Sequence, residues 1–66
     1  MTPEPPKNFE LRCDDVHPVR CDVAIRAISR EEATSRMCAH GAIAHGFTPG
    51  WYHPARVATF ERACVA

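Results

Sequence analysis

The sequence lacks a long apolar segment, has almost no lysine and carries no excess of either charge. No stretch reaches the roughly 20 apolar residues that a membrane-spanning helix needs, so we expect no membrane span. Eight acidic and eight basic residues cancel, and Lys7 is the only lysine. A neutral chain has no electrostatic bias towards nucleic acid or acidic membranes. The composition therefore disfavours both as partners.

The N-terminus also lacks the marks of a secretory signal, namely a basic start, an apolar run and a small-residue cleavage site. We therefore expect a cytoplasmic protein, in which thiols stay reduced. The prolines at positions 3, 5 and 6 predict that residues 1–8 form an extended, disordered lead-in.

The chain is also too short to form a large hydrophobic core. Chains of about this length usually depend on disulfides, a bound metal or a partner for stability. Four cysteines and four histidines in 66 residues supply the first two means. Reduced cytoplasmic thiols favour metal binding over disulfides.

Two short segments show the alternation of apolar and polar side chains that is typical of half-buried strands. They are residues 9–13 and residues 21–27, and the turn-rich residues 14–20 between them include Pro18. A hairpin of these strands would bring Cys13 and Cys21 close together, on the side that carries the apolar residues.

A helix follows, with clear signals at both ends. Ser29 is a good N-cap, Glu32 completes a capping box, and Gly46 suits the position just after the helix. One stripe of this helix is predicted to contain Ala33, Met37, His40 and Ala44. The element order is therefore β-β-α, a small α+β, zinc-finger-like fold over residues 9–47. Residues 48–66 form a C-terminal extension, with a second, shorter helix predicted at 55–65, near Pro54.

The residues that carry chemistry are two cysteines on the predicted hairpin and two histidines near the end of the predicted helix. They are Cys13, Cys21, His40 and His45. Thiolate and imidazole suit a tetrahedral Zn²⁺, and the spacing of the histidines is usual for such sites, although that of the cysteines is longer than usual. Helix residues five apart differ by about 140° in direction. The histidines can therefore converge only if the helix loosens, which Gly41 would allow.

Other interpretations of the same residues remain open. Cys13 and Cys21 could form a disulfide or be small buried residues, and His40 and His45 could be a core histidine and a helix-terminal cation. The other cysteines and histidines look incidental. Cys38 and Cys64 are expected in the core or at an interface, and His17 and His53, each beside a proline, in surface loops.

The spacing of these motifs resembles that of a small prokaryotic family of uncharacterised, zinc-finger-like domains. The resemblance covers residues 9–47 and rests on Cys-x-Asp-Val-x-Pro-x2-Cys from Cys13 to Cys21, Glu31-Glu32, and His40-x4-His45-Gly46. Here the loop between the cysteines is one residue longer, and Gly41 replaces the family's usual alanine. The resemblance implies the metal site and the fold, and it implies no activity.

A site closed by four protein ligands leaves no open position for a substrate, so we expect a structural Zn²⁺ and no enzyme. The favoured function is a protein-interaction or regulatory adaptor, because aromatic and arginine residues are common interface anchors. The candidate contacts are Trp51, Tyr52, Phe60 and Arg56, which could equally cover the open side of the hairpin and helix. The alternative is a nucleic-acid-binding, transcription-regulator-like finger. In it Ser29, Glu32 and Ser35 would face the bases, and none of them suits the common arginine–guanine contact.

Overall fold

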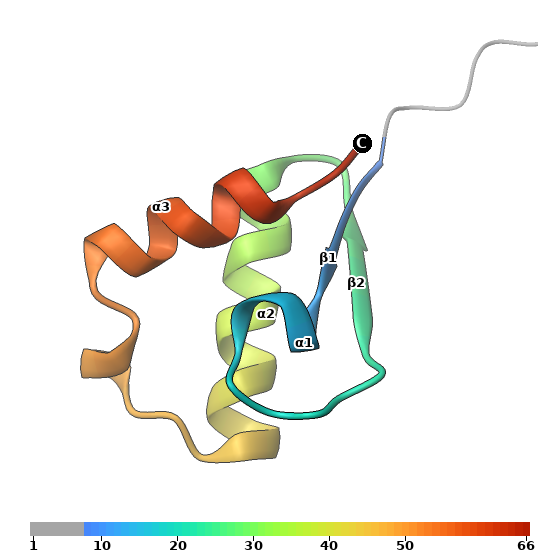
Figure 1. Ribbon diagram of the computed structural model, residues 1–66. Helices are drawn as coiled ribbons and strands as arrows, with labels where there is room; N and C mark the ends of the chain where they lie inside the picture. The colour runs from blue at the N-terminus through green and yellow to red at the C-terminus, as the bar shows by residue number, and fades with distance from the viewer. Residues whose placement is uncertain (1–7) are drawn as a thin grey trace, which may run out of the picture.

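Two short antiparallel strands open the fold, β1 (Phe9–Arg12) and β2 (Ala24–Ala27) (Figure 1). The structure is a computed structural model that describes residues 8–66, so all of the predicted lead-in except Asn8 lies outside the described residues. Leu11 pairs with Ile25 and Phe9 pairs with Ala27. Leu11 is fully buried on the inner face, while Glu10 and Arg26 form an ion pair on the outer face.

Both strands are shorter than predicted: β2 begins only at Ala24, and β1 ends at Arg12 because Cys13 begins a single helical turn, α1 (Cys13–Val16). The amide of His17 closes this turn by donating to the carbonyl of Cys13 at 2.9 Å. Asp14 and Asp15 favour the turn, since negative charge stabilises the first turn of a helix. Cys21 therefore lies in the loop before β2 rather than on a strand.

The long helix α2 (Arg30–His45) begins and ends as predicted. The hydroxyl of Ser29 accepts a hydrogen bond from the amide of Glu32 at 3.1 Å, and Gly46 adopts a left-handed conformation with φ of 73°. The buried stripe differs from the predicted one. It contains Ala33, Thr34, Met37 and Gly41, and Ala44 is exposed. The reason is that both strands and α3 pack against α2, so the covered face follows steps of four residues.

The extension folds back against α1 and α2. A short 3-10 helix, η1 (Pro49–Trp51), leads to α3 (Pro54–Ala63), which ends two residues earlier than predicted. The chain leaves the helix because Val65 pairs with Glu10 through backbone hydrogen bonds of 2.7 and 3.0 Å. Figure 1 shows the C-terminus beside the start of β1 as a result.

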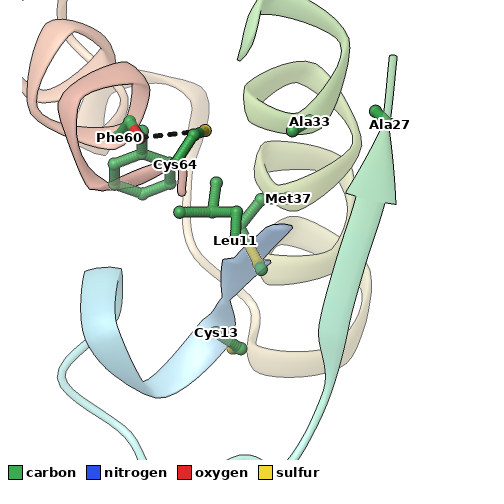
Figure 2. Packing of buried hydrophobic residues seen from close by; sticks show 7 residues of the cluster. All are labelled: Leu11, Cys13, Ala27, Ala33, Met37, Phe60 and Cys64. Atoms are coloured by element: carbon green, nitrogen blue, oxygen red, sulfur yellow. Dashed lines mark hydrogen bonds between the residues drawn. The ribbon is translucent and has the colours of Figure 1, made fainter. Parts of the chain in front are cut away.

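The core joins all of these elements. Its largest fully buried side chains are Leu11 from β1, Cys13 from α1, Met37 from α2 and Phe60 from α3. Figure 2 shows Leu11 between Phe60 and Met37, with Cys13 at the lower end of the cluster. The predicted class is confirmed: the chain has a small α+β fold, consistent with a zinc-finger-like ββα arrangement. Among residues 8–66, no helix combines the length and apolar character that crossing a membrane requires.

Candidate metal centre

The two cysteines of the candidate site lie where the hairpin widens into its loop. Cys13 follows β1 directly, and its amide donates to the carbonyl of Val23 at 3.0 Å, which extends the pairing of the strands by one step. The Cys13 side chain is fully buried, and that of Cys21 is half-buried. These two residues reach the site from opposite sides of the same loop.

The two histidines reach the cysteines from the last turns of α2. The Sγ atom of Cys13 lies 3.5 Å from Nε2 of His45, and the Sγ atom of Cys21 lies 3.5 Å from Nε2 of His40. One possible ligand atom from each of the four residues lies within 4.8 Å of the other three. From usual zinc bond lengths, a tetrahedral ion separates a sulfur ligand from a nitrogen ligand by about 3.6 Å. The four residues could therefore hold a metal ion.

The end of α2 is widened, and this helps the two histidines to converge. The amide of Gly46 donates to the carbonyl of Gly41, five residues back, where an α-helix would use four. The amide of Phe47 also donates to this carbonyl, at 3.3 Å. The rings of His40 and His45 lie with their centroids 5.1 Å apart. The loosening expected at Gly41 is therefore present, and it is confined to the end of the helix.

Burial controls the protonation of Cys13 in the absence of a metal. It raises the pKa of the Cys13 thiol to about 11, with further contributions from a hydrogen bond and charge at Cys21 and from the charge of Asp14. At neutral pH Cys13 is then an uncharged thiol. A metal ion that binds its sulfur has to displace the proton, because thiolate is the form that binds metals.

The prediction that His17 is a surface loop residue is wrong. Only 4% of His17 is exposed, and its Nδ1 atom lies 3.5 Å from Sγ of Cys13. Its Nε2 atom lies 2.8 Å from the hydroxyl of Tyr52. The signal that could have revealed the contact of His17 with Cys13 is the spacing of four residues between them, which is about one helical turn. His53 is exposed, as expected.

The other cysteines lie outside this group. All four cysteines of the sequence are free, so Cys13 and Cys21 do not form the hairpin disulfide that the sequence left open. Cys64 is buried beside Phe60, and its thiol donates to the carbonyl of that residue at 3.4 Å. Cys38 is half-buried at the edge of the core, where burial raises the pKa of its thiol.

The residues predicted to contact a partner mostly cover the molecule itself. Phe60 is only 1% exposed, so its prediction as a surface contact is wrong: α3 turns this side chain into the core. Trp51 and Tyr52 are half-buried. The guanidinium of Arg56 lies 3.9 Å from the ring centroid of Trp51. Trp51 and Tyr52 thus pack against the buried cluster that contains Phe60, as the alternative interpretation expected.

Comparisons of this chain with protein-family models, with curated proteins and with solved structures gave no match. The family resemblance described from the sequence motifs therefore stays a prediction.

Proposed function

We propose that this chain binds one structural Zn²⁺ through Cys13, Cys21, His40 and His45 and acts as a protein-interaction or regulatory adaptor in the cytoplasm. The observation that carries the metal site is the convergence of four ligand atoms within 4.8 Å of one another. Two thiols and two imidazoles are a donor set that suits zinc, and the 3.5 Å sulfur–nitrogen separations suit tetrahedral geometry.

A structural role for the metal fits the size of the core. Only seven apolar residues are buried among those described, and four of them have the small side chains of alanine or cysteine: Cys13, Ala27, Ala33 and Cys64. Structural zinc contributes about 10–16 kcal/mol in small finger domains, which is more than such a core leaves as net stability. Four protein ligands complete the tetrahedron, so the metal would have no open position for a substrate. This supports the proposal that the protein is not an enzyme.

The surface supports a protein partner better than a nucleic acid. Three arginines are already paired with acidic side chains, in the pairs Arg12–Asp14, Arg26–Glu10 and Arg36–Glu32. The chain is neutral overall, which leaves little positive charge for phosphates. Ile28, Ile43 and Val65 are each more than 60% exposed and offer apolar contacts to another protein.

Metal binding is tested by adding Co²⁺ to the reduced, metal-free chain. The proposal expects the absorption of tetrahedral Co²⁺ together with a thiolate-to-cobalt charge-transfer band, and loss of both when Zn²⁺ is added. An octahedral Co²⁺ spectrum without the charge-transfer band would refute the ligand set.

The adaptor role is tested by capture of proteins with the zinc-loaded chain, with the Cys21→Ser variant as a matched control. A partner retained by the zinc-loaded chain and not by the variant supports the proposal. Sequence-selective binding of duplex DNA at physiological salt would instead support the nucleic-acid alternative, since non-specific phosphate contacts weaken steeply with salt.

A further inference from the structure

His17 is the buried polar side chain closest to the candidate site that is not itself one of the four ligands. It lies between the site and the extension: Nδ1 is 3.5 Å from Sγ of Cys13, and Nε2 is 2.8 Å from the hydroxyl of Tyr52. The three side chains therefore form a chain of hydrogen bonds from the loop before α3 to a proposed metal ligand.

The chemistry of the three groups fixes the direction of these hydrogen bonds. A metal-bound Cys13 thiolate has no proton and can only accept, so Nδ1 of His17 must donate. A neutral imidazole has one N–H, so Nε2 then accepts from the hydroxyl of Tyr52.

Neighbouring aromatic rings and a glycine of α2 hold the His17 ring in place. Phe47 and Trp51 stack on it, with ring centroids 5.0 and 5.2 Å away and interplanar angles of 29° and 12°. On the side of α2, Gly41 leaves the space that the His17–Tyr52 pair occupies. A Cβ atom at that position would overlap the hydroxyl of Tyr52 and Nε2 of His17.

We propose that His17 is a positioning residue of the metal centre, which donates its Nδ1–H to the Cys13 thiolate while Tyr52 holds the ring in the required tautomer. This rests on the proposed zinc site. The hydrogen bond withdraws electron density from the sulfur, so the thiolate is less reactive towards electrophiles. It also orients the sulfur towards the metal, so the metal is released more slowly. Because Tyr52 and Trp51 belong to the extension, docking of the extension sets how firmly the metal is held.

The test compares three variants with the wild-type chain. His17→Phe keeps an aromatic ring between Phe47 and Trp51 but cannot donate. His17→Asn keeps a donor near the place of Nδ1 but loses the contact with Tyr52. Tyr52→Phe removes only the hydroxyl that fixes the tautomer.

Two measurements are made on each variant. They are the energy of the thiolate-to-cobalt charge-transfer band and the rate of Zn²⁺ transfer to a chelator. For His17→Phe we expect a shift of the band to lower energy and an increase of about 10-fold or more in the transfer rate, as for other outer-shell partners. His17→Asn should restore values close to wild type, and Tyr52→Phe should change both in the same direction as His17→Phe but less.

Wild-type band energy and transfer rate in a folded His17→Phe variant would overturn the inference, while the zinc site itself would stand. If His17→Phe does not fold, Tyr52→Phe decides, and wild-type values in that variant would equally overturn it. A wild-type chain that binds neither Co²⁺ nor Zn²⁺ would instead refute the proposed function, and this inference with it.

Discussion

The four proposed ligands should be individually necessary, because a structural Zn²⁺ site is four-coordinate and the loss of one ligand leaves an open position. We expect the substitutions Cys13→Ser, Cys21→Ser, His40→Ala and His45→Ala each to weaken Zn²⁺ binding by more than about 100-fold. Even outer-shell partners of a metal contribute about 10–100-fold. Competition with a chromophoric chelator measures the loss.

Cys38→Ser and Cys64→Ser are the matched controls, since both thiols lie outside the group of four. They should keep the metal and lose only packing energy. If His45→Ala retained zinc while Cys38→Ser or Cys64→Ser lost it, the ligand set would be wrong.

Gly41 is a second position at which we expect a substitution to change stability clearly. Alanine is the better helix former by about 1 kcal/mol, so helix propensity alone predicts that Gly41→Ala stabilises α2. Its methyl group would instead overlap the hydroxyl of Tyr52 and the ring of His17. We expect a net loss of roughly 1–3 kcal/mol in the free energy of unfolding of the zinc-loaded chain, as for other overpacked sites.

Urea denaturation of the Gly41→Ala variant measures this loss. Gly50→Ala is the control, because a Cβ atom there meets nothing within 4 Å. A Gly41→Ala variant that is more stable than wild type would show that the His17–Tyr52 pair does not pack against α2 as described.

At the scale of elements, the extension is expected to be part of the folding unit, because α3 supplies Phe60 to the centre of the core. Replacing a buried phenylalanine with alanine costs about 3–5 kcal/mol. A chain of this length has a net stability of about the same size. Phe60→Ala should therefore strongly lower the urea midpoint of unfolding of the zinc-loaded chain.

Circular dichroism of the zinc-loaded chain against urea concentration measures this midpoint. Ile43→Ala is the control, since Ile43 is 87% exposed and its truncation should change stability by no more than about 0.5 kcal/mol. Equal effects of Phe60→Ala and Ile43→Ala would mean that α3 is not packed on the core.

Local signals were sufficient to predict α2 and insufficient to predict α1. The N-cap at Ser29 and the left-handed Gly46 act within one turn of the helix, so both ends could be located from the sequence alone. The turn at Cys13 competes with continued strand pairing, and the outcome depends on contacts that the sequence pattern does not show.

The candidate site, too, could be predicted from the sequence only in part. Spacing alone brought together Cys13, Cys21, His40 and His45 as candidate ligands, and the structure places them in one group. The spacing of residues in the sequence could not show that His17 is buried, because the contact that holds His17 comes from Tyr52, 35 residues later. Next to Pro18, the local pattern around His17 resembles an exposed turn.

At the scale of the whole molecule, metal binding should depend strongly on pH. The metal-free chain keeps the Cys13 proton over most of the neutral range, because burial raises the pKa of this thiol to about 11 in the folded chain and an unfolded cysteine has a pKa of about 8.5. Zn²⁺ must displace it, and a higher pH removes the competing protons. The apparent affinity should therefore rise by up to about tenfold per pH unit between about pH 6 and about pH 8 from this thiol alone, because one proton is displaced.

Chelator competition at a series of pH values measures this dependence. Cys13→Ser is the control, since it lacks the proton in question and should show a shallower slope. An affinity that does not change with pH in the wild-type chain would contradict thiolate ligation by Cys13.

Native mass spectrometry of the reduced chain, before and after chelation, tests the zinc-dependent fold most directly. The predicted result is a monomer with a single Zn²⁺ and the low charge states of a folded chain, and after chelation a metal-free chain with the high charge states of an unfolded one. A metal-free monomer that keeps its low charge states would contradict the account. If that monomer were also lighter by the hydrogens that a disulfide loses, a bond between Cys13 and Cys21 would replace the metal site.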